Sequence, residues 1–153
     1  MERWVGIAVS GEQLTLVDAT VEVGKPLVIN FDKTFKLQKG PRPEAYKTMH
    51  HQVFDYIKTN KIDLAVIKAS AVSQSAGKAH LNAAELRGVV MAAAAAATQV
   101  SLQDKAQISK TFGERKFDAY LKDETFWSKS ISGVTLRGGS RDAALILLAQ
   151  RGK

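Results

Sequence analysis

Three extended runs fill the first 37 residues, and they constrain the fold more than any other part of the sequence. The apolar run at residues 4–9 ends at the turn Ser10-Gly11-Glu12, and residues 13–19 alternate apolar and polar side chains with a period of two. A third run starts at Leu27 and extends toward Leu37. Two strands that are joined by a tight turn and followed by a third predict an antiparallel meander.

Helices and strands alternate in the rest of the chain. Pro43 suits the first turn of a helix, and apolar side chains at helical spacing continue that helix over residues 44–60. The short apolar run at residues 62–67 predicts a parallel strand reached by a crossover. A long alanine-rich helix over residues 80–98 then leads into another strand at residues 99–102.

Shorter helices complete the predicted fold. We expect them at residues 104–111 and 116–121, and we expect an apolar last helix at residues 143–150 with Ser140 as its N-cap. The sequence therefore predicts an α/β fold with a mixed five-stranded sheet, in which three antiparallel strands precede two parallel ones and helices flank the sheet. Because no repeat or linker interrupts residues 1–153, we expect one domain.

Composition excludes several classes of protein. The 153 residues are 45% apolar and 24% charged, which is typical of a globular chain, and such a length buries about 70% of the unfolded surface. The longest apolar stretch, at residues 88–97, is much shorter than the ~20 residues that a membrane helix needs, so no membrane span is expected. The chain has no cysteine, which excludes a disulfide scaffold and favours the reducing cytoplasm.

The charge balance indicates an anionic partner. Lys and Arg number 22 against 15 Asp and Glu, a formal net charge of +7, and such an excess favours a polyanion such as DNA or RNA. Aromatic side chains lie among the basic residues of the second half, a mixture that can stack on bases and pair with phosphates. Acidic residues such as Asp118 and Asp123 dilute this basic cluster.

Five short motifs follow one another along the predicted elements. They are Gly6-Ile7-Ala8-Val9-Ser10, Leu64-Ala65-Val66-Ile67-Lys68, the stretch from Leu81 to Arg87-Gly88, Ser109-Lys110-Thr111-Phe112-Gly113, and Gly139-Ser140-Arg141-Asp142-Ala143. In order and spacing they resemble the RuvC branch of the RNase H-like fold, the Holliday-junction resolvase family, and they are similar to short bacterial proteins with a RuvC-like domain. The resemblance covers most of the chain.

The resemblance also implies where a metal site would lie. RuvC-type nucleases cut a phosphodiester with two Mg²⁺ ions that are held by carboxylates from the first strand, the fourth strand and the last helix. At these positions the chain has Ala8, Lys68, Gly139 and Asp142, so only Asp142 can ligate a metal ion. We expect a degenerate catalytic site without metal or other cofactor, in which the Lys68 ammonium pairs with the Asp142 carboxylate. The alternative is that Lys68 points into solvent.

Four other acidic residues could supply metal ligands after a rearrangement: Glu12, Asp18, Glu85 and Asp104. Glu12 lies in a turn about four residues from Ala8, which is too far along a strand without such a rearrangement, and Glu85 is expected on a solvated surface. If the ligands do rearrange, the chain is an Mg²⁺-dependent nuclease. His50 and His51 face different directions on their predicted helix, so they do not predict a metal site.

Five basic residues are candidates for contact with nucleic acid: Lys68, Lys78, Arg87, Arg137 and Arg141. Lys78 closes a loop of small residues at 73–78 that would let a phosphate come close, and the alternative is an ordinary surface loop. Gly138 and Gly139 precede the last helix between Arg137 and Arg141. Free backbone amides at such a helix end can bind an anion, and the alternative is an ordinary N-cap.

The sequence is consistent with three functions. The first is a catalytically degenerate RuvC-like protein that binds DNA or RNA or acts as a non-catalytic subunit of a complex. The second is an active metal-dependent nuclease with rearranged ligands. The third is a protein-interaction module that forms a homodimer through the alanine-rich helix, from Val89 to Ala97, and a bulky residue at Ala94 would then abolish its function.

Overall fold

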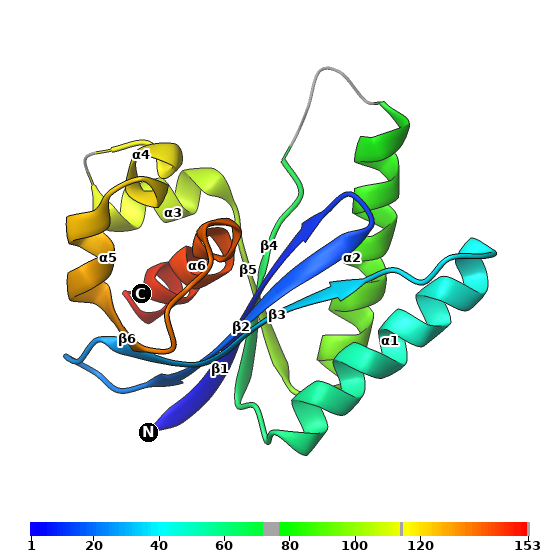
Figure 1. Ribbon diagram of the computed structural model, residues 1–153, viewed down its shortest axis with the longest axis horizontal. Coiled ribbons are helices and arrows are strands. Elements are labelled where there is room, and N and C mark those ends of the chain that lie inside the picture. Colours follow the sequence, from blue (N-terminus) through cyan, green and yellow to red (C-terminus); the bar gives the residue numbers. More distant parts are fainter. Residues whose placement is uncertain (72–76, 114, 153) are drawn as a thin grey trace.

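The computed structural model describes residues 1–71, 77–113 and 115–152 (Figure 1). Within these residues a mixed sheet has the strand order β5-β4-β1-β2-β3-β6. Its strands are β1 (Glu2–Ser10), β2 (Gln13–Val21), β3 (Leu27–Lys36), β4 (Leu64–Lys68), β5 (Gln99–Gln103) and β6 (Ile131–Gly133). β1, β2 and β3 form an antiparallel meander, β4 runs parallel to β1, β5 runs parallel to β4, and β6 runs parallel to β3.

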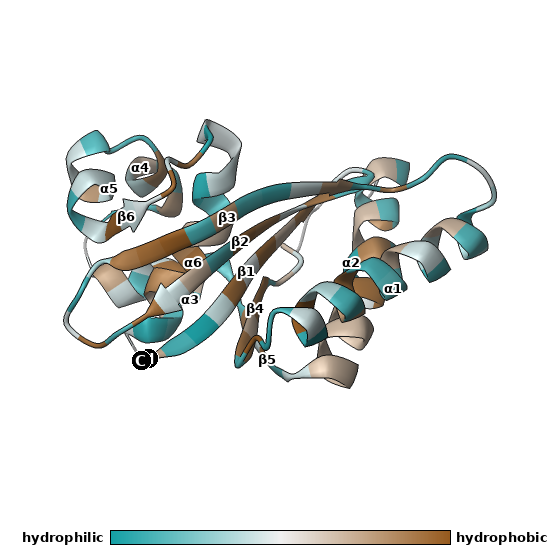
Figure 2. Cartoon of the chain, turned by 60° about the horizontal axis from the view of Figure 1, so that its bottom comes forward, coloured by the Kyte–Doolittle hydropathy of each residue, from teal (hydrophilic) through white to brown (hydrophobic). Residues whose placement is uncertain are grey.

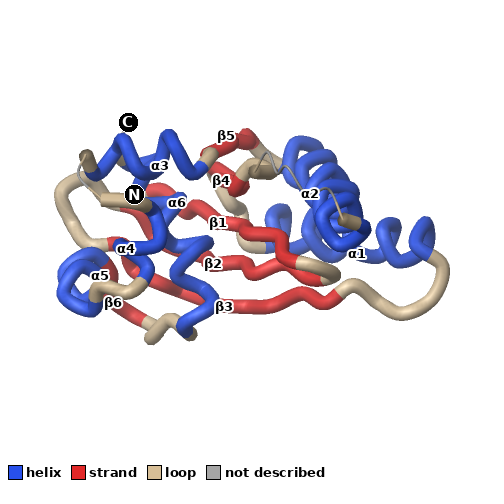
Figure 3. The backbone as a smooth tube through the Cα atoms, turned by 90° about the horizontal axis from the view of Figure 1, so that it is seen from above, coloured by secondary structure: helices blue, strands red, loops and turns tan. Residues whose placement is uncertain are grey.

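Helices cover both faces of the sheet (Figures 1 and 3). One face carries α1 (Arg42–Thr59) and α2 (Lys78–Ala97). The other carries α6 (Arg141–Arg151), and the shorter helices α3 (Lys105–Phe112), α4 (Phe117–Leu121) and α5 (Glu124–Ser130) lie around it. A 3-10 turn, η1 (Gly138–Ser140), leads into α6. None of the described helices is long and apolar enough to cross a membrane.

Alternate residues of the strands serve two separate cores. Val5, Ile7 and Val9 of β1 pack in the core beneath α1 and α2, whereas Ala8 of the same strand packs in the core beneath α6. Successive side chains of a strand point to opposite faces, so each inner strand contributes to both cores. Figure 2 shows hydrophobic residues along the strands, interspersed with polar ones, and helices that carry both kinds.

Gly6 lets α6 approach the sheet closely. A Cβ at this position would overlap the carbonyl oxygen of Ala143 and lie 2.9 Å from the side chain of Leu147. α6 is correspondingly apolar, and every residue from Ala143 to Ala149 is buried. The glycine of the first strand motif therefore fixes the height of α6 above β1.

The predicted meander, crossover strand, alanine-rich helix and last helix are confirmed, and so is a mixed sheet flanked by helices. The predicted count of five strands is wrong, because β6 adds a sixth strand beside β3 with Ile131 opposite Leu27. β6 has only three residues, which is too short for a periodic pattern to be visible in the sequence. The helix α5 that precedes it was not predicted either.

The predicted N-cap of α6 at Ser140 is confirmed, although its side chain makes no capping hydrogen bond. Ser140 stands at the N-cap position, but its hydroxyl donates a hydrogen bond to the carboxylate of Asp32 on β3 at 2.5 Å. Arg137 donates to the same carboxylate through its backbone N–H at 3.0 Å and its guanidinium at 2.7 Å. Burial alone would raise the pKa of Asp32, but these hydrogen bonds outweigh it and lower the pKa. The cluster ties η1 to β3.

Candidate functional site

Lys68 and Asp142 form an ion pair between the sheet and α6. Lys68 is the last residue of β4, and its side chain lies on the α6 face because Val66, two residues earlier, packs in the core beneath α6. Asp142 lies in the first turn of α6. The Lys68 Nζ and Asp142 Oδ2 atoms are 2.9 Å apart, and the two side chains are 18% and 32% exposed. The predicted pair is therefore present, and the alternative of a solvated Lys68 is wrong.

Ala8 lies beside this pair. β1 and β4 are paired in parallel up to Ile7 and Ile67, so the next residues, Ala8 and Lys68, lie side by side on the same face. Ala8 is buried in the core beneath α6. Gly139 is exposed in η1, three residues before Asp142. The sheet thus brings Ala8 and Lys68 to the N-terminal end of α6.

The residues at these positions do not fit a pair of Mg²⁺ ions. Mg²⁺ requires near-octahedral oxygen coordination, and among Ala8, Lys68, Gly139 and Asp142 only Asp142 has a carboxylate. Its Oδ2 atom accepts from the Lys68 ammonium, and its Oδ1 atom is buried without a hydrogen-bond partner in the described residues. Across residues 1–71, 77–113 and 115–152, no three His, Asp or Glu side chains converge in an arrangement that could hold a metal ion.

The four acidic residues that could have replaced the missing ligands are engaged elsewhere. Glu12 and Glu85 both pair with Arg42, at 3.6 and 3.3 Å. Asp18 is fully buried and bonds to Tyr56 of α1, so it lies on the opposite face of the sheet. Asp104 caps α3.

Aromatic and basic groups surround the Lys68 ammonium. Its Nζ atom lies 4.4 Å from the centroid of the Phe117 ring, and the Lys105 Nζ atom lies 5.6 Å from the same centroid. Phe117 is buried, with 4% of its surface exposed. A cation over an aromatic face is attracted by the ring quadrupole, so Phe117 helps to hold the Lys68 ammonium at Asp142.

A cleft of about 540 Å³ opens next to the ion pair. Its walls come from the ends of β1, β4 and β5 and from the starts of α2 and α3, and they are lined by Val9, Lys68, Ala69, Ser70, Ala71, His80, Ala83, Arg87, Asp104, Lys105 and Ala106. The acidic residue of this lining is the helix cap Asp104, whereas Lys68, Arg87 and Lys105 carry positive charge. The cleft is therefore basic.

Arg87 lines this cleft and makes no ion pair with an acidic side chain of the described residues. Its guanidinium donates to the carbonyl oxygen of Val9 at 3.3 Å and to the hydroxyl of Ser70, which are both neutral acceptors. Its Nε atom is buried without a hydrogen-bond partner among the described residues. Burial lowers the pKa of Arg87. The positive charge of Arg87 is thus held in place and partly desolvated, and no acidic side chain of the described residues balances it.

The five predicted nucleic-acid contacts do not lie together. Lys68 and Arg87 line the cleft, and Lys78 is exposed at the first residue of α2. The loop that it closes, residues 73–76, lies outside the described residues. Arg137 is paired with Asp32 at 2.7 Å. Neither Arg137 nor Arg141 lines the cleft. The sequence did not single out His80 and Ser70, which also line it.

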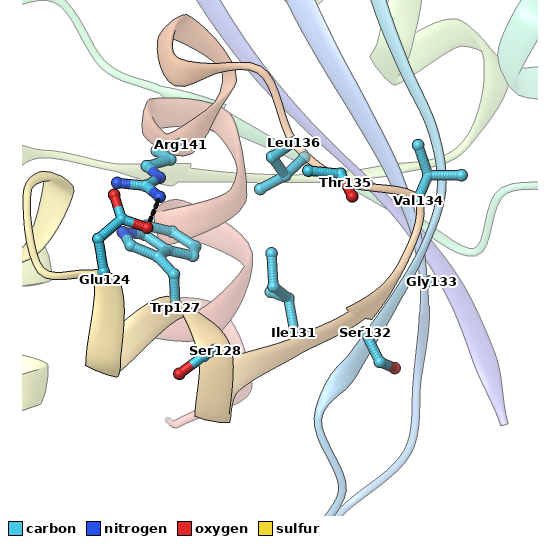
Figure 4. A pocket seen from close by; sticks show the side chains of 10 residues that line it. All are labelled: Glu124, Trp127, Ser128, Ile131, Ser132, Gly133, Val134, Thr135, Leu136 and Arg141. Carbon is cyan, nitrogen blue, oxygen red and sulfur yellow. Dashed lines mark hydrogen bonds and ion pairs between the residues drawn. The ribbon is translucent and has the colours of Figure 1, made fainter.

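Arg141 lies at a separate hollow of about 210 Å³ between α5, β6 and α6 (Figure 4). Its guanidinium is turned toward Glu124, with an N–O distance of 2.8 Å, and stands 5.6 Å from the centre of the Trp127 ring. It also donates to the carbonyl oxygen of Leu121 at 2.9 Å. The charge of Arg141 is thus already compensated within the chain.

Solved structures of resolvases have the same architecture. Thermus thermophilus RuvC in complex with a Holliday junction substrate superimposes with a TM-score of 0.74 at 14% sequence identity, over 99% of this chain and 94% of that chain. A second structure of Thermus thermophilus RuvC gives a TM-score of 0.73 at 16% identity, over 98% and 93%. The yeast mitochondrial Holliday junction resolvase gives 0.70 at 11% identity, over 99% and 79%.

The likeness is one of structure. No protein-family model matches the sequence, and no curated protein matches it significantly. At 11 to 16% identity the superpositions establish the fold, and they agree with the motif order in the sequence. The chain has the RuvC-like form of the RNase H-like fold.

Proposed function

We propose that the protein binds nucleic acid in the cleft beside Lys68 and Asp142 and does not cut it by metal-dependent catalysis. The observation that carries the proposal is Arg87, a partly desolvated cation that lies in a basic cleft and has no acidic partner among residues 1–71, 77–113 and 115–152. Leaving such a charge unbalanced is unfavourable, and an anionic ligand would offset the cost. One structure with the same fold, Thermus thermophilus RuvC, is in complex with a Holliday junction substrate, which makes a nucleic acid the first anion to test.

The chemistry of the cleft suits a phosphodiester backbone. Guanidinium and ammonium groups make charge-assisted hydrogen bonds to phosphate oxygens, and Arg87, Lys68 and Lys105 all face the same space. The small side chains of Ala69 and Ala71 leave room for a backbone to come close. Lys78, at the start of α2, extends the positive charge beyond the cleft.

The set of available metal ligands supports the proposal that the protein does not cut by metal-dependent catalysis. Two-metal cleavage needs several carboxylate oxygens around two cations about 4 Å apart. Among Ala8, Lys68, Gly139 and Asp142 only Asp142 has a carboxylate, and the Lys68 ammonium already contacts one of its oxygens. A cation there would meet like charge from Lys68 and Lys105, so the positions favour anion binding.

Fluorescence anisotropy with labelled nucleic acids tests the proposal. A four-way junction, a duplex, single-stranded DNA and RNA are titrated in EDTA over a series of salt concentrations. We expect binding of at least one of them without divalent metal, and an affinity that falls steeply with salt because bound cations are released from the backbone. Failure of all four to bind in EDTA, or binding that is insensitive to salt, contradicts the proposal.

A homodimer through α2 is the second candidate. The second half of α2, residues 88–97, is apolar, and Ala92, Ala95 and Ala96 are exposed on its outer surface, where an unpartnered apolar face favours a protein contact. Ala94 is fully buried in the chain's own core, so a bulky residue there would disturb the fold and would not test a dimer. Ala95→Arg is the suitable variant, and light scattering after gel filtration would show a dimer that this variant converts to monomer. The cysteine-free composition leads us to propose a cytoplasmic location for either function.

A further inference from the structure

The Asp142 carboxylate has the properties of a cation site that is already filled. It lies in the first turn of α6, where the helix dipole favours negative charge. One of its oxygens contacts the Lys68 ammonium at 2.9 Å, and the other is buried without a hydrogen-bond partner in the described part of the chain. A buried carboxylate oxygen without a donor can ligate a cation if the competing positive charge is removed.

The Lys68 ammonium is held in this position from more than one side. The Phe117 ring lies below it at 4.4 Å, and the side chain is only 18% exposed. Lys105 stands over the same ring and adds a second positive charge nearby. A divalent ion approaching Asp142 would therefore have to displace a held ammonium and enter a positive field.

We propose that the Lys68 ammonium is a built-in cation, which saturates the cation site at Asp142 and keeps divalent metal ions out of it. The metal site could be restored, because Lys68 and Ala8 lie side by side on neighbouring strands and could be replaced by residues with carboxylates. The proposal concerns cation binding alone, and it holds or fails whether or not nucleic acid binds in the cleft.

The test converts the site and measures metal binding without any nucleic acid. The double variant Lys68→Glu/Ala8→Asp places three carboxylates, with Asp142, around the ends of β1 and β4. Mn²⁺ suits carboxylate ligands, so binding is followed by the loss of its free electron paramagnetic resonance signal and by calorimetry. We expect one Mn²⁺ per chain with a Kd on the order of 10⁻⁴ M, typical of a weak oxygen site, and no binding by the wild type in the same range.

Two matched controls make the result specific. Lys105→Glu/Ala8→Asp has the same change in charge but leaves Lys68 in place, so it should not bind Mn²⁺ in this range. Lys68→Glu/Ala8→Asp/Asp142→Asn should lose the binding. The proposal is overturned if wild type and double variant bind Mn²⁺ equally, if the Lys105 control binds as tightly as the double variant, or if the folded double variant does not bind.

A single variant covers the case in which an aspartate at the buried Ala8 position prevents folding. Lys68→Glu alone places a second carboxylate beside Asp142, so its melting temperature should be lower than that of the wild type in EDTA. Because a ligand that binds only the folded state stabilises it, 10 mM Mn²⁺ should raise this melting temperature by roughly 5 °C. The wild type should not respond. An equal response of both proteins, or none in the variant, contradicts the proposal. Nucleic-acid binding is measured separately, on the wild type in EDTA, so a failure of one proposal is not mistaken for a failure of the other.

Discussion

Two basic regions flank the start of α6, and they differ in how their charge is balanced. On one side, the Arg137 guanidinium meets Asp32, and Arg141 meets Glu124. On the other side, Arg87 contacts a backbone carbonyl and a hydroxyl in the basic cleft. The sequence places basic residues in both regions, but the fold pairs Arg137 and Arg141 with carboxylates and leaves Arg87 without one among the described residues. A basic residue without an acidic partner indicates a binding site for an anion. A high number of basic residues alone does not identify such a site.

Removing the Asp32 carboxylate should produce the largest effect on stability, because it leaves Arg137 and Ser140 without their acceptor. Its side chain is 4% exposed and accepts hydrogen bonds from Arg137 and Ser140. We expect Asp32→Ala to lower the free energy of unfolding by about 2–4 kcal/mol, since charged and neutral donors lose a buried acceptor. Urea unfolding followed by circular dichroism measures this.

The same variant should leave nucleic-acid affinity nearly unchanged when measured on folded protein. Asp55→Ala is the control, because Asp55 is exposed on α1, and surface changes of this kind stay within about 0.5 kcal/mol. Equal stability of the Asp32 and Asp55 variants would mean that the region is not held by this cluster.

Arg87→Ala should have the opposite signature. We expect its affinity for nucleic acid in EDTA to fall by at least tenfold, which corresponds to about 1.4 kcal/mol. Stability should change little, because the guanidinium loses no acidic partner in the described part of the chain. Lys58→Ala removes one positive charge from the last turn of α1 and serves as the control. If both variants lose affinity equally, the effect reflects net charge and not the cleft.

The pH dependence of stability should also distinguish the regions. Hydrogen bonds from Arg137 and Ser140 outweigh burial and lower the pKa of Asp32. A carboxyl whose pKa is lower in the folded state contributes stability above its unfolded pKa of about 3.9, and it loses that stability as pH falls through the folded value. Wild type should therefore exceed Asp32→Asn in stability at pH 7, and the difference should shrink below about pH 4. A difference that is constant from pH 7 to pH 3 would show that the charge of Asp32 is not what stabilises the cluster.

Arg141→Ala should have the smallest effect. Glu124, its acidic partner, is 80% exposed, and exposed ion pairs contribute about 0–1 kcal/mol. We expect the affinity for nucleic acid to change by less than twofold, measured in the same anisotropy titration as Arg87→Ala. A loss as large as that of Arg87→Ala would extend the binding surface across the start of α6 and remove the distinction between the two regions.

Much of the fold could be predicted from local patterns. The meander shows period-two alternation, and the long helices show apolar side chains at helical spacing, so both are visible in the sequence. β6 was missed because three residues carry no period, and it forms only where β3 offers an open edge. The positions of Lys68 and Asp142 could be predicted through the motif resemblance, although 74 residues separate them.

The partners of the other basic residues could not be predicted. Arg137 and Asp32 lie 105 residues apart, and their contact depends on how η1 crosses the end of the sheet. The hydroxyl of Ser140 joins the same carboxylate, which a helix-capping pattern does not reveal. Ala94 is one of a run of alanines, and only the packing of α2 shows that it faces inward while Ala95 faces outward. Which charges are balanced and which alanines are exposed are properties of the packed chain.

The most direct test of the central claim is to ask whether the protein holds a nucleic acid and leaves it intact. A labelled four-way junction is incubated with the wild type in EDTA and in Mn²⁺, and each sample is run on a native gel and a denaturing gel. We predict a shifted complex in both conditions and uncut strands in both. A complex that is absent in EDTA, or strands that are cut in Mn²⁺ by wild type but not by Asp142→Asn, would contradict the account.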